Sequence, residues 1–151
     1  MYITTSRKPS DPTRKLARLV ANFIGTYENR GKKSIDEVVT RADELGDNRI
    51  MMLTERQGNP NSISFISIGK EWDWIGPEIM ISFDPSSIPR IGKLGKDVKY
   101  SGDKKYSGLF DFHEPYTDDM VELSMDDRQI SFNYKKSRFI LKIKGIRKPK
   151  V

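Results

Sequence analysis

The chain of 151 residues contains no cysteine and one histidine, His113. Without cysteine, disulfide bonds and thiolate metal sites are excluded, and one histidine without a supporting motif does not indicate a Ser-His-Asp triad. The longest apolar run is far shorter than the roughly 20 residues of a membrane helix. Residues 2–5 are typical of a strand rather than of the apolar core of a secretion signal. These absences predict a soluble intracellular protein without a membrane partner.

Charged residues are plentiful but unevenly distributed. The net charge is +6, and 32% of the residues are charged. Residues 6–33 contain eight basic and two acidic side chains, residues 135–151 contain eight basic side chains and no acid, and residues 111–127 contain seven acids and no lysine or arginine. This segregation favours a directed surface for a polyanion such as nucleic acid. A solvated charged surface without a partner is the alternative.

The first half of the chain predicts alternating strands and helices. An apolar face recurs at helical spacing over residues 16–24, after Asp11-Pro12, which is typical of a helix cap followed by proline. Ser34 and Glu37 predict a capping box at the start of a second helix. The predicted order is β-α-β-α-β-β-β, with strands at residues 2–5, 26–29, 49–55, 62–69 and 78–83, helices ending at Gly25 and Gly46, and a turn at residues 58–61.

The second half predicts strands and no amphipathic helix. Residues 84–105 contain prolines, glycines and spaced lysines, and they predict a connection with one short strand near residues 98–100. Strands are predicted at residues 120–125, 129–134 and 138–144. The fold class is therefore α/β (α+β) with two joined halves. The predicted division is an N-terminal α/β half (1–83), a connection (84–105), a mostly stranded C-terminal half (106–144) and a basic tail (145–151).

Two segments contain the residue types of catalytic or metal sites without a convincing pattern. Residues 92–97 superficially resemble a phosphate-binding loop, but the glycines are too close together and aspartate replaces the serine or threonine. Carboxylates near His113 could hold Mg²⁺, although a solvated acidic loop is the favoured interpretation. We therefore expect no catalytic residue, no metal and no cofactor.

The N-terminal basic residues form the favoured binding site. Arg14, Lys15 and Arg18 share one exposed helix face, and Arg7 and Lys8 lie in the loop before that helix. Backbone amides at the helix N-terminus add a further preference for phosphate. The predicted RNA-binding residues are Arg7, Lys8, Arg14, Lys15, Arg18, Arg30 and Lys32.

The C-terminal segment predicts a secondary basic surface: Arg138, Lys142 and Lys144 alternate with apolar residues and so share one strand face. The basic residues that follow predict a tail that binds RNA nonspecifically or, alternatively, only solubilises the chain end. This surface consists of Arg138, Lys142, Lys144, Arg147 and Lys148, and Lys150 continues it into the tail. Four aromatic residues of the second half are predicted to pack in the core, with stacking on unpaired bases as the alternative. They are Tyr100, Tyr106, Phe110 and Phe112.

Short motifs of the first half, taken in series, resemble the Brix-domain family. The motifs are Ile3-Thr4-Thr5-Ser6-Arg7-Lys8-Pro9-Ser10, Thr13-Arg14, Asn29-Arg30-Gly31, Asn48-Arg49-Ile50-Met51, Glu55-Arg56-Gln57-Gly58-Asn59-Pro60 and Ser62-Ile63-Ser64-Phe65. Their order and spacing match the family to about residue 69, and the match is looser beyond residue 84. The residues carried over are Arg7, Lys8, Pro9, Arg14, Arg30 and Gly31, of which Pro9 and Gly31 would shape loops.

The resemblance implies a non-catalytic ribosome biogenesis factor that binds precursor ribosomal RNA during rRNA processing and subunit assembly. Its expected partners are pre-ribosomal particles and other assembly proteins, with no small-molecule substrate. The resemblance also implies two similar halves, each like the anticodon-binding domain of class II aminoacyl-tRNA synthetases. A short single-domain chain is similar to the archaeal members, so the expected location is the cytoplasm, or the nucleolus in a eukaryote.

Two other functions stay open at this point. The acidic segment 111–127 would be the functional surface of a protein-interaction scaffold. Alternatively, Asp118, Asp119 and Glu122 would serve a metal-dependent nuclease.

Overall fold

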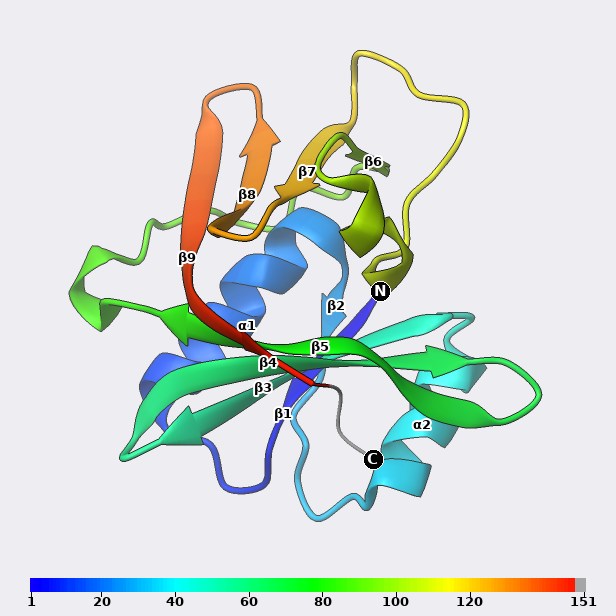
Figure 1. Ribbon diagram of the computed structural model, residues 1–151, viewed down its shortest axis with the longest axis vertical. Helices are drawn as coiled ribbons and strands as arrows, with labels where there is room; N and C mark the ends of the chain where they lie inside the picture. Colours follow the sequence, from blue (N-terminus) through cyan, green and yellow to red (C-terminus); the bar gives the residue numbers. More distant parts are fainter. Residues whose placement is uncertain (149–151) are drawn as a thin grey trace.

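The computed structural model describes residues 1–148, whose strands form one nine-stranded sheet (Figure 1). The first half contains β1 (Tyr2–Thr5), α1 (Asp11–Ile24), β2 (Thr26–Tyr27), α2 (Ile35–Glu44), β3 (Arg49–Arg56), β4 (Asn59–Ile68) and β5 (Trp72–Ser82). The second half contains the 3-10 helices η1 (Pro85–Ser87) and η2 (Lys104–Leu109) and the strands β6 (Val98–Tyr100), β7 (Val121–Met125), β8 (Gln129–Tyr134) and β9 (Ser137–Arg147). The predicted α+β class and the β-α-β-α-β-β-β order are confirmed.

The sheet has the order β2-β1-β3-β4-β5-β9-β8-β7-β6. In the first half β1 is parallel to β3, and β3, β4 and β5 follow as antiparallel neighbours. In the second half β6 is parallel to β7, and β7, β8 and β9 follow in the same antiparallel way. The second half therefore repeats the strand plan of the first, and β5 and β9 join the two in one sheet.

The helices differ between the halves. The α2 capping box is confirmed, because the Ser34 side chain accepts a hydrogen bond from the Glu37 amide and the Glu37 carboxylate accepts one from the Ser34 amide, both at 3.2 Å. Where the first half has α1 between β1 and β3, the second half has η2 and a loop between β6 and β7. Residues 84–148 therefore contain two short 3-10 helices and no α-helix, in agreement with the prediction of no amphipathic helix in this half. No helix within residues 1–148 is long and apolar enough to cross a membrane.

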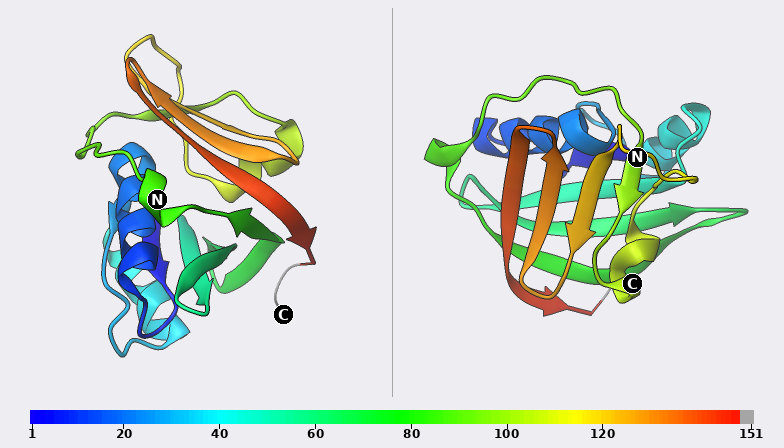
Figure 2. Two further views of the ribbon diagram at one scale, coloured as in Figure 1. Left: turned by 90° about the vertical axis from the view of Figure 1, so that its left-hand side faces the viewer. Right: turned by 90° about the horizontal axis from the view of Figure 1, so that it is seen from above.

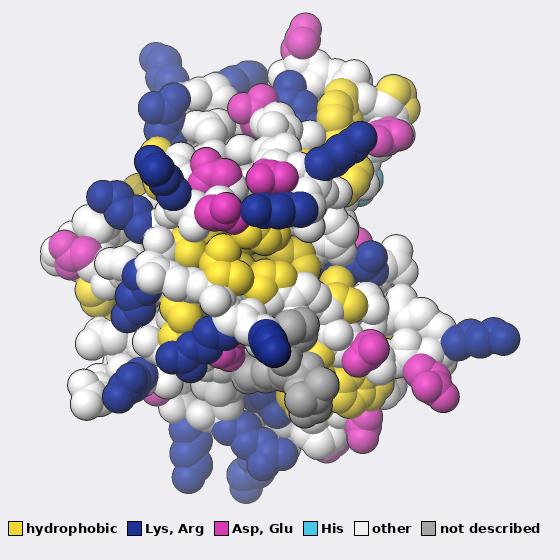
Figure 3. All heavy atoms as spheres, in the orientation of Figure 1, with side chains coloured by type: hydrophobic (Ala, Val, Ile, Leu, Met, Phe, Trp, Pro, Cys, Tyr) yellow, Lys and Arg dark blue, Asp and Glu magenta, His cyan; other side chains and the backbone are white. Residues whose placement is uncertain are grey.

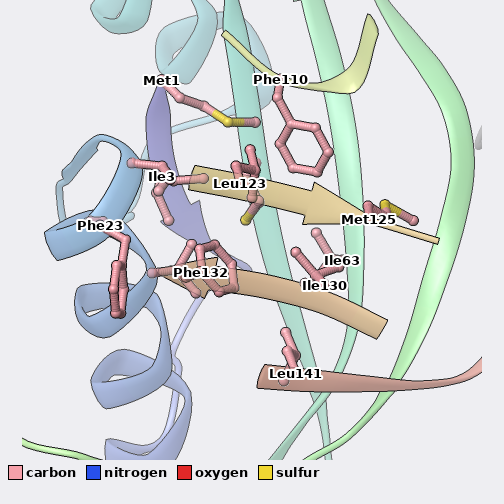
Figure 4. Packing of buried hydrophobic residues seen from close by; sticks show 14 of the residues in the cluster. Met1, Ile3, Phe23, Ile63, Phe110, Leu123, Met125, Ile130, Phe132 and Leu141 are labelled. Carbon is pink, nitrogen blue, oxygen red and sulfur yellow. The ribbon is translucent and has the colours of Figure 1, made fainter. Parts of the chain in front are cut away.

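The core lies between the two halves, with α1 along one side (Figure 2). Leu16, Val20 and Phe23 of α1 are buried there, and the Phe23 ring lies 5.5 Å from that of Phe132 on β8 (Figure 4). A second cluster forms on the other face of the first half, where Val38 and other residues of α2 pack on β1, β3 and β4. Each face of the first half is thus covered by one helix, and the exposed side of α1 is left for solvent or a ligand.

Four predicted strand boundaries were wrong. The strand β2 ends at Tyr27, two residues before the predicted end at residue 29. The turn between β3 and β4 consists of Gln57 and Gly58, which have φ angles of 52° and 79°, the positive values of a two-residue hairpin turn, so β4 already begins at Asn59. The strand β5 begins at Trp72 and continues through Gly76 and Pro77, because its pairing with β4 holds it in the sheet. The strand β9 reaches Arg147 through its pairing with β5, so the predicted tail begins inside a strand.

The connection between β5 and β6 passes along α1 (Figure 2). The Leu94 amide donates a hydrogen bond to the Asn22 carbonyl at 3.0 Å, and the Asn22 side-chain amide donates one to the Ile91 carbonyl at 2.8 Å. These bonds fix the connection beside the exposed face of α1, where it forms one wall of a hollow described below.

Candidate nucleic-acid interface

The first turn of α1 is anchored by an internal carboxylate. The Ser10 amide, the Ser10 hydroxyl and the Thr13 hydroxyl all donate to Glu55 Oε2, at 2.8, 2.8 and 2.6 Å. Ser10, rather than the predicted Asp11, is the cap residue. Glu55 places a negative charge beside the helix N-terminus, but its donors are the cap amide and two hydroxyls rather than the amides of the first helical turn, so the preference of those amides for phosphate stays a prediction.

The exposed face of α1 presents three cations, as predicted. Arg14 donates to the Pro9 carbonyl at 3.0 Å and forms an ion pair with Asp11, which is its i−3 neighbour. The Arg18 guanidinium lies over the Tyr27 ring at 5.4 Å, a cation–π contact that orients it without neutralising its charge. Lys15 is exposed beside them.

Arg30 is buried, with 6% of its surface exposed. Its Nε donates to the Lys33 carbonyl at 2.7 Å and its Nη1 to the Thr5 carbonyl at 3.2 Å, so the guanidinium is held in place by backbone. Burial and the charge of nearby Arg7 lower the pKa of Arg30. Within residues 1–148 no carboxylate forms an ion pair with it. A buried cation without an acid is costly for a fold, and an anionic ligand would compensate its charge.

Two loops bring Arg30 and the α1 cations together. Gly31 has a φ of 56° at the turn before α2, a conformation that favours glycine. Lys8 has a φ of 53° immediately before Pro9, an uncommon conformation for a lysine. The loop of Lys8 is tied to β3 by the Ser6 amide, which donates to the Leu53 carbonyl at 2.9 Å. The predicted loop-shaping positions, Pro9 and Gly31, thus lie where the chain turns sharply.

The two loops and α1 enclose a hollow of about 460 Å³, which we call the cationic hollow. Figure 3 shows lysine and arginine side chains projecting from the lower edge of the molecule, where Figure 1 has the loops that follow β1 and precede α2. Five cations and no acid line the hollow. The lining residues are Lys8, Pro9, Arg14, Arg18, Asn29, Arg30, Gly31 and Lys32. Five of the seven predicted RNA-binding residues and both loop-shaping residues therefore meet at one place.

The other two predicted residues flank the cationic hollow. Arg7 reaches toward the same turn, with its Nε 3.5 Å from the Lys33 carbonyl. Lys15 lines a second hollow on the far side of Arg18. The acid Glu28, from the same segment of the sequence, is directed away from these cations, because it pairs with Arg41 of α2 at 2.9 Å and accepts a hydrogen bond from Tyr2. The positive charge of the segment is therefore largely uncompensated at this surface.

The predicted secondary basic surface is spread along β9. Arg138, Lys142 and Lys144 are all exposed, as the strand alternation predicted, but Arg138 lies near the β8–β9 turn and bonds to Asn133. Lys144 and Arg147, at the other end of the strand, line a hollow of about 370 Å³ together with Arg56 of β3. Lys148 is exposed and Lys150 lies outside the described residues. Arg56 was missed because the sequence gives no sign that the β3–β4 turn approaches β9.

The acidic segment 111–127 does not form one open acidic face. Asp119 pairs with Lys96 at 2.8 Å and accepts a hydrogen bond from Tyr134, and Asp127 pairs with Lys105 at 2.9 Å. The hydrogen bond from Lys96 lowers the pKa of Asp119, and hydrogen bonds from Tyr106 and Lys105 lower the pKa of Asp127. In the part of the chain that the structure describes, no three His, Asp or Glu side chains lie close enough together to hold a metal ion, so Asp118, Asp119 and Glu122 do not form the nuclease site considered above.

The aromatic residues of the second half pack inside. Tyr100, Tyr106 and Phe110 are at most 9% exposed, which confirms the predicted core role for these three. Burial, chiefly, raises the pKa of Tyr100 to about 12. Phe112 is half-buried against the same cluster. His113 accepts a hydrogen bond from the Val98 amide at 3.3 Å and so lies at the edge of β6.

Comparison with known proteins places this chain among archaeal homologues. No family model matches the sequence. A relative from Pyrococcus horikoshii is 36% identical over 81 residues, which are 50% of this chain and 35% of that protein. One from Methanopyrus kandleri is 34% identical over 104 residues, 67% and 52% of the two chains, and one from Methanosarcina barkeri is 30% identical over 104 residues, 64% of each. All three are named probable Brix domain-containing ribosomal biogenesis proteins. The chain spans about a third to two thirds of the length of these curated relatives.

Two solved structures share the fold. A probable ribosomal biogenesis protein from Aeropyrum pernix superposes with a TM-score of 0.73 and 22% identity, over 99% of this chain and 96% of that one. An archaeal Imp4-like protein called Mil superposes with a TM-score of 0.62 and 24% identity, over 100% and 99% of the two chains. The curated homologues confirm the resemblance to Brix-domain proteins, and the two superpositions confirm the mixed α+β architecture.

Proposed function

We propose that this homologue of archaeal Brix domain-containing ribosomal biogenesis proteins is a non-catalytic ribosome biogenesis factor that binds precursor ribosomal RNA through the cationic hollow. The observation that carries the proposal is the set of five cations that line the hollow with no acid among them, one of which is the buried Arg30. Phosphate is the ligand that this arrangement suits, because arginine binds phosphate oxygens in a bidentate way and the guanidinium of Arg30 is already fixed.

The proposed contacts are to the RNA backbone. Arginine and lysine contacts to phosphates fix the position of a protein on nucleic acid without reading its sequence. Structured RNA is recognised largely by shape and by contacts to phosphates and 2′-hydroxyls. The protein would therefore hold a folded region of precursor RNA during rRNA processing and subunit assembly, alongside other assembly proteins in pre-ribosomal particles.

Three further parts of the proposal rest on the resemblance. The first half, over residues 1–83, would follow the anticodon-binding domain of class II aminoacyl-tRNA synthetases, and residues 106–144 would be its shorter counterpart. The working location would be the archaeal cytoplasm. The relatives' names support the role in ribosome biogenesis, and the absence of a catalytic function is inferred from the family.

The test is RNA binding by a variant in which Arg7, Arg14 and Arg18 are all replaced by alanine. Affinity for an RNA hairpin, measured by fluorescence anisotropy, should fall by at least about tenfold, because three phosphate contacts are removed. The matched control replaces three exposed lysines elsewhere with alanine and so removes the same charge. The control lysines are Lys70, Lys104 and Lys136. Equal losses in the two variants would reject the hollow as the binding site and leave only nonspecific charge attraction.

A further inference from the structure

A second hollow lies between α1 and the connection that follows β5, and none of the functions above uses it. Its volume is about 420 Å³, in the lower part of the roughly 300–1,000 Å³ range of sites that hold small organic groups. Four lining residues belong to α1 and five to the connection. They are Lys15, Arg18, Leu19 and Asn22, and Pro85, Ile88, Pro89, Arg90 and Ile91.

The lining of this second hollow mixes polar and apolar side chains, and its apolar part is held in place. Leu19 is buried in the α1 face, and Ile88 and Ile91 are partly buried against the core. The hydrogen bond from the Asn22 side chain to the Ile91 carbonyl ties the connection to α1. Pro85 and Pro89 restrict the backbone of the connection. The hollow is therefore a preformed surface with an apolar floor.

The rim of the second hollow is cationic. Lys15, Arg18 and Arg90 contribute three positive charges, and no lining residue is acidic. None of the three forms an ion pair within residues 1–148. Arg18 lines both hollows, so they adjoin on the exposed face of α1. A ligand that fits this second hollow therefore has a flat apolar part and a negative charge. Because the two hollows adjoin, the same ligand extends into the cationic hollow.

We propose that the second hollow holds an unpaired nucleotide of the RNA whose neighbouring phosphates occupy the cationic hollow. The base would lie against Ile88 and Pro89, and its phosphates would meet Arg18 and Arg90. Arginine guanidinium planes also stack on unpaired bases. Asn22 supplies an acceptor for an amino group of the base, because its amide nitrogen is engaged by Ile91 and its amide oxygen accepts no hydrogen bond within the described residues.

The ligand is unpaired rather than duplex RNA for a physical reason. In a duplex the base faces stack on one another and only their edges and the backbone are exposed, so an apolar wall gains nothing from contact with it. An unpaired base leaves its face free to cover apolar side chains. This inference rests on the proposed function, and it adds that the preferred RNA is a junction between a helix and a single strand.

The experiment compares three RNAs that share one hairpin: a blunt form, a form with four unpaired 3′ nucleotides, and a form whose 3′ extension is abasic. The two extended forms carry the same phosphates, so any difference between them reports the bases. The full-length protein should bind the extension with bases about five- to tenfold more tightly than the abasic one, as expected for one well-covered base.

Two variants locate the effect. Ile88→Ser should remove the preference for bases over abasic sugar, and Arg90→Ala should weaken both extended forms but not the blunt hairpin. Ile140→Ser, which changes an isoleucine exposed on β9, is the matched control and should keep the preference. Circular dichroism and thermal melting confirm that each variant is folded, and Arg90→Ala tests the site even if Ile88→Ser does not fold.

The outcomes separate this inference from the proposed function. Equal affinity of the wild-type protein for the base-containing and abasic extensions would overturn the inference, as would tight binding of free adenosine monophosphate, since the hollow would then serve a small nucleotide. If the Arg7, Arg14 and Arg18 triple variant loses RNA affinity while bases have no effect, only the inference fails. If the triple variant binds every RNA as tightly as the wild-type protein does, the proposed function fails, and the inference that rests on it fails with it.

Discussion

Replacing Glu55 with glutamine tests whether its carboxylate anchors the interface helix. One oxygen of Glu55 accepts three hydrogen bonds from Ser10 and Thr13. The amide oxygen of glutamine can replace these acceptors but not the charge, and hydrogen bonds to charged groups exceed neutral ones by about 1 kcal/mol. A carboxylate at a helix N-terminus adds about 0.3–1 kcal/mol. Because the three bonds share one partly exposed oxygen, we count the excess of about 1 kcal/mol once, so with the helix contribution Glu55→Gln should lower the free energy of unfolding by about 2 kcal/mol, or about 4–8 °C in Tm for a chain of this size.

The pH dependence of this loss makes the prediction specific. Burial by itself would raise the pKa of Glu55. The hydrogen bonds from Thr13 and Ser10 together outweigh this effect and lower the pKa from its ordinary 4.5. A depressed folded-state pKa gives stability that is fully present above the unfolded value and is lost as the pH falls through the folded value. Urea denaturation should therefore separate the variant from the wild-type protein at pH 7, and the gap should be smaller at pH 3, below the ordinary carboxyl pKa. A gap that is the same at both pH values would refute the reasoning, and Glu71→Gln, in an exposed turn, should show no gap.

Other changes test the capping of α2 and the packing of the second half. Ser34→Ala removes the acceptor for the Glu37 amide and should cost about 1 kcal/mol in thermal denaturation; an unchanged Tm would show that the capping box does not stabilise the protein. Gly102→Ala should cost about 2 kcal/mol or more, because its Cβ would lie 2.3 Å from the Met125 amide nitrogen. Gly108→Ala is the matched control, since no heavy atom lies within 4 Å of its Cβ position, and equal losses in the two variants would contradict the packing described here.

Local sequence signals predicted the first half well. Periodic apolar residues located α1, and Ser34 with Glu37 located α2, because helix formation and capping depend on neighbours within a few positions. Strand β5 was predicted too short, since Gly76 and Pro77 usually interrupt strands. Gly76 has a positive φ, and a Cβ there would lie 2.2 Å from Leu109. The missing side chain at Gly76 leaves room for Leu109, so that η2 can pack against the sheet. This is a long-range contact, which the local sequence does not reveal.

The cationic hollow was predicted in composition but not in geometry. The spacing of Arg14 and Arg18 predicted a shared face, whereas the burial of Arg30 depends on carbonyls of Thr5 and Lys33 that come together only in the fold. Glu55 carries no local sign of its role, because its position at the start of α1 depends on the pairing of β3 beside β1. The second hollow, which Arg90 lines, was missed for the same reason. The sequence of the connection contains no pattern that indicates which helix it packs against.

The most direct test of RNA binding by the cationic hollow is the salt dependence of affinity for an RNA hairpin. With about five phosphates contacted, the logarithm of the association constant should fall with the logarithm of salt concentration with a slope of roughly −3 to −5. In the Arg7, Arg14 and Arg18 triple alanine variant the slope should become shallower by about 2 to 3, since each lost phosphate contact removes about one unit or less. A triple variant with the wild-type slope and affinity would contradict the account.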